Sequence, residues 1–339
     1  MTSSHFVRGI LTTFALTLCG TTMSFARQNG VTAHNETPPK EDGSAPSTKH
    51  VDVYDEHADA KTQIAEAVTR AKKDNKRVLI QWGGNWCIWC TRLHNLYAAN
   101  KDLAHELLYE YEVVYIDTGV PKGKNVDVAN SYGAQVEKDG FPYLTILDDD
   151  GKVVANHDTG SLETKEKDAA PGHDPRLVLD VLKKNEAPQI DAQRALDGAL
   201  AKAKSEHKRV FLHFRAPWCG WCKRLEAWMD QDDVKAILAK DFIDLRIDQD
   251  RMIGGKDLKP RFGADETSGI PWFAFLDENG KALADSVSAK GNIGFPQAPE
   301  ELAHFEDMLK KASQSMTSDD IAVLLTSLHG QHKDANAAQ

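Results

Sequence analysis

One segment constrains the fold of this chain more than any other, because the chain contains it twice. Residues 76–93 and 208–225 each begin with a basic pair and an apolar run that is too short for a helix and suits a buried strand. A Trp, two Cys three positions apart and an apolar pattern with helical spacing follow in both segments. A strand, a tight turn, a Cys-x-x-Cys pair and a helix form the layout of a redox dithiol rather than of a structural disulfide.

The spacing within each cysteine pair has a chemical consequence. Residues three apart at the start of a helix lie one above the other, so Cys87 faces Cys90 and Cys219 faces Cys222. The first sulfur then lies at a helix N-terminus, where unpaired N–H groups and the helix dipole favour a thiolate below the ordinary thiol pKa of about 8.5. We therefore predict that Cys87 and Cys219 are nucleophiles that attack disulfides. Cys90 and Cys222 are the predicted resolving thiols.

Both segments resemble the active-site segment of the thioredoxin superfamily, in which a hydrophobic strand leads into W-C-x-x-C and a helix. The stretch R-A-P-W-C-G-W-C-K-R-L-E at 215–226 is similar to bacterial thioredoxin-like domains that have Trp before the second Cys. The resemblance covers residues 57–313 as two copies and implies an α/β chain of two tandem thioredoxin folds, each a central mixed sheet flanked by helices. It also implies that Trp86 and Trp218 are active-site tryptophans that contribute to substrate binding.

The two prolines that follow the dithiols form a second motif. Pro142 and Pro271 each stand at the start of a predicted central strand, where a residue without an N–H is unusual. The resemblance implies a cis proline beside the dithiol, with the preceding residue pairing its backbone with the substrate, as in strand addition. Phe141 and Ile270 would have that pairing role. A proline that only initiates the strand is the alternative interpretation.

The third feature is a departure from the family pattern. Thioredoxins carry an Asp six residues before the first Cys, beneath the resolving thiol, and this chain has Gln81 and His213 at those positions. A Gln side chain cannot exchange a proton, whereas His can near neutral pH, so His213 is a predicted catalytic base and a hydrogen-bonded core histidine is the alternative. His94 and Glu226, one turn after each second Cys, are expected on solvated helix faces. The residues between the cysteines also differ from the family's Gly-Pro, which leaves the direction of electron flow open.

The order of these motifs along the chain predicts five parts, of which the two thioredoxin-like domains repeat one another. They are a signal peptide at 1–26, a flexible linker at 27–56, a first thioredoxin-like domain at 57–187, a second at 188–313, and a C-terminal short helix and tail at 314–339. The first cysteines are 132 residues apart and the prolines 129 residues apart, which suggests duplication. In the first domain we expect helices near 57–74, 126–132 and 174–185 and strands at 77–82, 112–117, 144–147 and from 153. In the second we expect helices near 190–206 and 298–313, strands at 209–215, 242–248 and ending at 276, and an extra helix at 317–328.

The first 26 residues carry the pattern of an export signal. Arg8 precedes an apolar run at 10–19 that is too short to span a bilayer, and Ser24-Phe25-Ala26 fits a small-x-small cleavage site. We therefore expect an exported protein, periplasmic or extracellular. Residues 16–19 also resemble a lipobox, but Leu18 stands where a small residue is expected, so a lipid anchor at Cys19 is the weaker alternative.

Composition limits the remaining function classes. Of the 5 Cys, one lies in the predicted leader and four form the two dithiols, so we expect no framework disulfide. Between Cys90 and Cys219 lie 128 residues, far more than the roughly 15–20 of zinc ribbons, so neither a metal nor another cofactor is expected. The formal net charge of −10 argues against nucleic-acid partners.

The sequence thus predicts an exported thiol-disulfide oxidoreductase that reduces or exchanges protein disulfides through two Cys-x-x-Cys sites. Its expected partners are disulfide-containing proteins or peptides, and a membrane thiol reductase is a candidate electron donor. The alternative from another class is a peptide-binding or chaperone-like module of thioredoxin fold without steady redox turnover. Turnover of a disulfide substrate distinguishes the two hypotheses.

Overall fold

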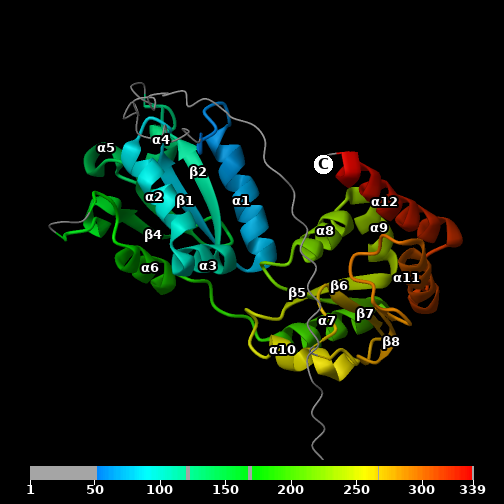
Figure 1. Cartoon of the computed structure of the whole chain (residues 1–339). Helices are drawn as coiled ribbons and strands as arrows, with labels where there is room; N and C mark the ends of the chain where they lie inside the picture. The colour runs from blue at the N-terminus through cyan, green and yellow to red at the C-terminus, as the bar shows by residue number, and fades with distance from the viewer. Residues whose placement is uncertain (1–51, 120–122, 167–169, 266, 338–339) are drawn as a thin grey trace, which may run out of the picture. The chain divides into compact units, whose positions relative to one another are not determined.

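The computed structural model describes residues 52–119, 123–166, 170–265 and 267–337. The predicted signal peptide, Cys19 and most of the predicted linker lie outside these residues. Within the described ranges, no helix has the length and apolar character needed to cross a membrane. Figure 1 shows two α/β domains that follow one another along the chain, each with a sheet flanked by helices.

Domain 1 is a four-stranded mixed sheet with strand order β2-β1-β3-β4. β1 pairs parallel with β2 and antiparallel with β3, and β3 pairs antiparallel with β4. The elements are α1 (Ala60–Asp74), β1 (Arg77–Gly83), α2 (Ile88–Ala99), α3 (Lys101–Glu110), β2 (Tyr111–Asp117), α4 (Val126–Ser131), α5 (Val136–Asp139), β3 (Tyr143–Leu147), β4 (Val153–Asp158), the 3-10 helix η1 (Thr159–Leu162) and α6 (Pro175–Lys184).

Domain 2 repeats this topology with strand order β6-β5-β7-β8 and the same parallel and antiparallel pairings. The mixed sheets predicted from the sequence are therefore confirmed in both domains. The elements are α7 (Ala192–Glu206), β5 (Arg209–Arg215), α8 (Gly220–Met229), α9 (Asp232–Asp241), β6 (Phe242–Asp248), α10 (Gly255–Leu258), the 3-10 helix η2 (Lys259–Phe262), β7 (Trp272–Leu276), β8 (Ala282–Asp285), β9 (Val287–Ser288), β10 (Gly291–Asn292), α11 (Pro299–Ala312) and α12 (Ser318–Ala337).

The first helix of each domain begins and ends in the same way. Asp59 caps α1 by accepting the Thr62 N–H at 2.8 Å, and Asp191 caps α7 through the Arg194 N–H at 2.8 Å. Both helices end at a residue with left-handed backbone, Asn75 with φ 51° and His207 with φ 54°. The two domains thus share these helix boundaries as well as strand order.

The central strand of each sheet is buried on both faces, and its alternating side chains fix which residues lie beneath the dithiol. In β1, Val78, Ile80 and Trp82 pack in the cluster that includes α1, whereas Leu79 packs with Leu93 of α2. Successive side chains of a strand point to opposite faces, so the residue two after Leu79, which is Gln81, also faces α2. The same alternation directs His213 of β5 towards α8.

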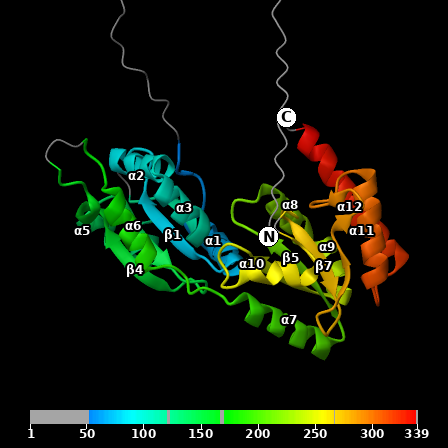
Figure 2. The same cartoon turned by 60° about the horizontal axis from the view of Figure 1, so that its bottom comes forward.

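The C-terminal segment differs from the expectation of a short helix and a tail. α12 continues to Ala337, and its Ile321, Leu324 and Leu328 are buried in the cluster that contains Phe305 of α11. Figures 1 and 2 show α11 and α12 side by side. The spacing of these apolar residues predicts a helix, but the polar residues after Leu328 gave no sign that it continues. α12 therefore belongs to the core of domain 2.

The end of the predicted linker is also corrected. Residues 52–56 precede α1 and contact domain 1, and the side chain of Tyr54 is only 3% exposed. Both amide hydrogens of Val53 and Tyr54 are donated to the Asn85 side chain at 3.0 Å. The surrounding charged and turn-forming residues mask this contact in the sequence, because its partner lies about one helix and one strand further along the chain.

Candidate active site

Each Cys-x-x-Cys pair forms a disulfide at the start of a helix. Cys87 and Cys219 are the N-cap residues of α2 and α8. Their sulfurs accept the backbone N–H of Cys90 and Cys222 at 3.1 Å, as the oxygen of a capping Ser would. The Cα atoms of the bonded cysteines are 5.2 Å apart in domain 1 and 5.3 Å apart in domain 2. The predicted position of the first sulfur at a helix N-terminus is thus present twice.

The two sulfurs of each pair differ in their access to solvent. Cys87 is 6% exposed and Cys90 is fully buried, while Cys219 is 3% exposed and Cys222 1%. A large exposed aromatic precedes each first cysteine, with Trp86 45% exposed. In domain 2, Trp218 and Trp221 are both exposed and adjoin the disulfide in sequence. The first cysteine of each pair is therefore the less deeply buried one, and the exposed tryptophans beside it form an apolar surface of the kind that marks protein contacts.

The two proline loops lie beside the disulfides. The Phe141–Pro142 and Ile270–Pro271 peptide bonds are both cis, as predicted. In domain 2 the Cys219 Sγ lies 3.7 Å from the Ile270 carbonyl oxygen. In domain 1 the ring of Trp86 meets Phe141 edge-on, with 5.5 Å between their centroids. The proline loops, the tryptophans and the first cysteines thus come together in each domain.

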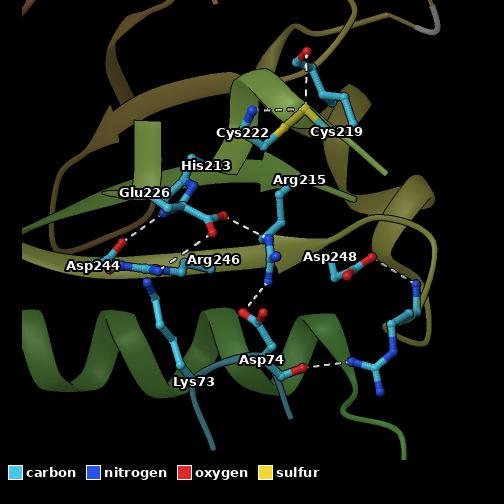
Figure 3. A network of polar contacts seen from close by, with 12 residues as sticks. Lys73, Asp74, His213, Arg215, Cys219, Cys222, Glu226, Asp244, Arg246 and Asp248 are labelled. Carbon is cyan, nitrogen blue, oxygen red and sulfur yellow. Dashed lines mark hydrogen bonds and ion pairs between the residues drawn. A yellow bond between two sulfur atoms is a disulfide. The ribbon is translucent and has the colours of Figure 1, made fainter. Parts of the chain in front are cut away.

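Beneath the domain 2 disulfide lies a charged network, shown in Figure 3. His213 is buried, and its Nε2 lies 2.9 Å from the Asp244 Oδ1. Arg246 donates from Nε to the other oxygen of Asp244 at 2.8 Å. Desolvation opposes ionisation of Asp244, but the hydrogen bond with His213 and the charge of Arg246 hold the pKa of that carboxyl well below its usual range. With Nε2–H donated to Asp244, the His213 Nδ1 keeps a free lone pair, and this atom has no hydrogen-bond partner among the described residues.

A buried carboxylate extends this network along α8. Glu226 is buried, and its Oε1 forms an ion pair with the Arg215 Nε at 2.8 Å. Its Oε2 lies 3.8 Å from the Arg246 Nη1, and Arg215 also pairs with Asp74 at 2.6 Å. The expectation that Glu226 lies on a solvated helix face is therefore wrong. Its cationic partners come from strands β5 and β6, and no pattern within α8 reveals them.

The corresponding floor of domain 1 is neutral. Gln81 is fully buried, and its Nε2 donates to the Tyr54 Oη at 2.6 Å and to the Cys90 carbonyl oxygen at 3.2 Å. The Tyr115 Oη lies 2.9 Å from the His94 Nδ1, and burial raises the pKa of Tyr115 to about 12. Burial also lowers the pKa of the half-buried His94. Phenols and an amide thus replace the ion pairs of domain 2.

Sequence reasoning placed Gln81 and His213 beneath the dithiols but missed their partners. The strand register brings Tyr115, Asp244 and Arg246 to the site, and hydrogen bonds to Asn85 bring the segment of Tyr54. Within the described residues, no group of three or more His, Cys, Asp or Glu side chains is arranged to hold a metal ion.

Two family models match the domains. The model described as a thioredoxin-like domain matches residues 64–170, and a second one, described as thioredoxin-like, matches residues 191–278. Together they cover most of the two folded domains, and each spans the dithiol of its own domain.

Individual proteins of known name also resemble parts of the chain. A protein disulfide-isomerase, erp38, of Neurospora crassa is 27% identical over 154 residues, which are 45% of this chain and 38% of that protein. The thioredoxin domain-containing protein 5 homolog of Drosophila melanogaster is 26% identical over 42% of this chain and 36% of its own length. The crystal structure of a disulphide isomerase from Xylella fastidiosa Temecula1 is 30% identical, with a TM-score of 0.34, over 40% of this chain and 96% of that one.

The chain spans little more than a third of the length of these two curated relatives. Its own two domains nevertheless each combine a mixed sheet, a dithiol at a helix N-terminus and a cis proline. With the two family models, these features show that the chain belongs to the thioredoxin-like proteins.

Proposed function

We propose that this chain is an exported thiol-disulfide oxidoreductase that reduces or exchanges disulfides of proteins or peptides. One observation carries the proposal. In both domains the more exposed sulfur of a disulfide caps a helix and lies beside a cis-proline loop. A structural disulfide needs no such surroundings, whereas an exchange site needs a sulfur that a client can approach, and exposed tryptophans beside it offer a surface for the client.

The reaction in domain 2 follows from this arrangement. In the reduced protein, the Cys219 thiolate attacks one sulfur of the client disulfide, and the electron pair of the broken bond goes to the other client sulfur. Cys222 then attacks the Cys219 Sγ, which releases the second client thiolate and leaves the protein oxidised. His213 accepts the Cys222 proton at Nδ1 while its Nε2–H remains hydrogen bonded to Asp244.

The substrate-binding residues are proposed from their position around the first sulfur. Trp86, Phe141 and Pro142 serve this role in domain 1, and Trp218, Ile270 and Pro271 in domain 2. The Ile270 carbonyl beside Cys219 is suited to accept a backbone N–H from an extended client segment. Such backbone contacts tolerate many client sequences.

The site of action and the electron donor complete the proposal. The leader pattern at 1–26 supports export to a periplasmic or extracellular compartment, with lipid anchoring at Cys19 as the less favoured form. A membrane thiol reductase is the proposed donor, because a reductase outside the cytoplasm needs electrons delivered to its disulfides.

The test is steady turnover of a model protein disulfide by the purified chain with a thiol donor. Turnover should be lost in the Cys87→Ser, Cys219→Ser double variant, since neither site then has a nucleophile. Cys90→Ser and Cys222→Ser should instead accumulate mixed disulfides with the client, visible by mass spectrometry. Client binding without turnover in the wild-type chain would reject the enzyme and favour the peptide-binding module.

A further inference from the structure

Tyr54 brings a buried phenol to the sulfur of the resolving cysteine in domain 1. A Cβ placed on Gly83 would lie 2.5 Å from the Cys90 Sγ and 2.7 Å from the Tyr54 Oη. The sulfur and the phenol oxygen therefore both pack closely against Gly83, which is possible only because residue 83 has no side chain. Cys90 is fully buried there.

The phenol has an unused hydrogen. Gln81 donates to the Tyr54 Oη at 2.6 Å, so this oxygen already acts as an acceptor. Tyr54 packs in one cluster with Cys87 and Cys90, so its O–H can turn towards the Cys90 sulfur. Burial raises the pKa of Tyr54 well above its usual value, so the phenol keeps its proton and remains a donor.

Asn85 fixes the segment that carries Tyr54. Its Oδ1 accepts the N–H groups of Val53 and Tyr54 at 3.0 Å, and its Nδ2 donates to the Tyr54 carbonyl at 2.9 Å. Asn85 itself stands two residues before Cys87, directly before the active-site tryptophan. The segment before α1 is thus attached to the dithiol loop by three hydrogen bonds from one side chain.

Domain 2 has none of these residues at the matching positions. Arg215 replaces Gly83 at the end of the strand, and Pro217 replaces Asn85. Tyr54 lies five positions before the N-cap residue of α1, and the residue at the same distance before the N-cap of α7 is Glu186. The glycine, the asparagine and the phenol thus occur together in domain 1, and all three are replaced in domain 2, as expected for residues that act together.

We propose that Tyr54 is a positioning residue that donates a hydrogen bond to the Cys90 sulfur when the domain 1 disulfide opens. This proposal rests on the proposed function. A thiolate of the electron donor attacks the Cys87 Sγ, the bond to Cys90 breaks, and its electron pair goes to the Cys90 Sγ. The Tyr54 O–H then bonds to that thiolate without transferring its proton. A more stable thiolate is a better leaving group, so Tyr54 accelerates reduction of this site.

The experiment uses the full chain with Cys219→Ser and Cys222→Ser, so that only the domain 1 disulfide reacts. Tyr54→Phe removes the hydroxyl and keeps the ring. We expect the rate of disulfide reduction by reduced glutathione to fall about tenfold, as for loss of one hydrogen bond to a charged group. In chains that also carry Cys87→Ser, the thiolate absorbance of Cys90 should show that Tyr54→Phe raises the pKa of Cys90 by about one.

Tyr111→Phe is the matched control. Tyr111 is a second buried phenol of domain 1, and it donates to the Leu182 carbonyl at 2.5 Å rather than to a sulfur. It should leave both the rate and the Cys90 pKa unchanged. Asn85→Ala keeps the phenol but releases its segment, so it should move both quantities in the same direction as Tyr54→Phe and by a smaller factor.

The outcomes separate the two proposals. If the Cys219→Ser, Cys222→Ser chain with Tyr54 present neither accepts electrons nor reduces a client, the proposed function of domain 1 fails. If that chain is active and Tyr54→Phe changes neither the rate nor the Cys90 pKa, the role of Tyr54 fails alone. Equal slowing by Tyr54→Phe and Tyr111→Phe, without a change in the Cys90 pKa, would likewise overturn it as a general loss of packing.

Discussion

The two dithiols share their geometry above the sulfurs and differ in the chemistry below them. Both first cysteines cap a helix, and both prolines are cis. Below the sulfurs, domain 1 has Gln81 bonded to the phenol of Tyr54, whereas domain 2 has His213 bonded to Asp244. The strand register makes these sets comparable, because the strand neighbours of Leu79 and Phe211 are Val113 and Asp244 respectively.

This difference separates what the fold requires from what it leaves free. The sheet and the helix N-terminus fix the distance and access of the two sulfurs, so those features are the same in both copies. The layer beneath the helix contacts the dithiol from one side only, and the fold accepts either neutral or ionic groups there. At matching positions domain 2 has His213 bonded to a carboxylate, whereas domain 1 has Gln81 bonded to the phenol of Tyr54. The copies are therefore expected to handle the resolving thiol's proton in different ways.

The largest expected difference is in stability. Glu226→Gln removes the buried carboxylate that pairs with Arg215 and faces Arg246. Removing one member of a buried ion pair typically costs 3–5 kcal/mol, and because Arg215 keeps Asp74 we expect about 3 kcal/mol. Hydrogen exchange of the β5 amides in the full chain measures the loss. The matched change His94→Gln in domain 1 breaks one neutral hydrogen bond and should cost about 1 kcal/mol. Equal losses of stability in the two domains would mean that the ion pairs of Glu226 contribute no more than the neutral hydrogen bond of His94.

The next largest effect is kinetic. His213→Gln gives domain 2 the residue that domain 1 has at the same position, and it removes the proposed proton acceptor for Cys222. We expect release of a client from the Cys219 mixed disulfide to slow about a hundredfold at neutral pH. The loss should diminish in acid, since protonated imidazole cannot act as a base. The measurement is single-turnover kinetics against pH in a chain with Cys87→Ser and Cys90→Ser. Unchanged release rates would assign His213 to the core as a hydrogen-bonded histidine.

Many features that the two domains share could be predicted from the sequence. The two dithiols and the order of the main strands along the chain follow from local patterns of a few adjacent residues, whereas the cis prolines are implied by the resemblance to the thioredoxin superfamily. The position of Gln81 and His213 beneath the resolving thiols is implied by the resemblance to the thioredoxin superfamily, and the period-2 alternation of a buried strand is its structural reason. The strands at 209–215 and 242–248 agree with the sequence prediction residue for residue.

The residues that distinguish the layers beneath the two dithiols could not be predicted from local sequence patterns. Tyr54 lies in a charged, turn-rich segment, and only its contact with Asn85, 31 residues later, makes it part of the site. Glu226 is indistinguishable in sequence from a solvated helix residue until Arg215 and Arg246 are placed beside it. Such contacts depend on tertiary packing rather than on periodicity, which is why motif reasoning gave the sulfurs and missed their surroundings.

A smaller effect separates the domains in acid. The pKa of Asp244 is lowered in the folded chain, so its ion pair with Arg246 and its hydrogen bond with His213 contribute stability. That stability is complete above the unfolded Asp pKa of about 3.9 and is lost as pH falls through the lower folded value. The carboxylate is 40% exposed, so solvent screening limits the contribution to about 1 kcal/mol. Asp244→Asn should therefore destabilise domain 2 by that amount at pH 7 and by progressively less below pH 4. Val113→Asn, the matched change in domain 1, should show no such pH dependence. A constant difference between wild type and Asp244→Asn from pH 7 to pH 3 would contradict the ionic account of this floor.

The smallest expected effect concerns a feature that the two copies share in shape but not in residue type. α1 and α7 both end in left-handed backbone, at Asn75 and His207. Both residues carry a Cβ, but the short polar side chain of Asn makes this conformation less costly than it is for His. The Asn75 Nδ2 also donates to the Pro188 carbonyl at 2.9 Å. His207→Gly should therefore stabilise domain 2 by about 0.5 kcal/mol, because the relief of strain exceeds the extra entropy that Gly gives the unfolded chain. Asn75→Gly should not stabilise domain 1, because the change relieves little backbone strain and removes the hydrogen bond to Pro188. Hydrogen exchange at the last turn of each helix measures both changes, and an equal gain at the two positions would show that backbone shape alone, rather than the residue that adopts it, sets the stability of these helix ends.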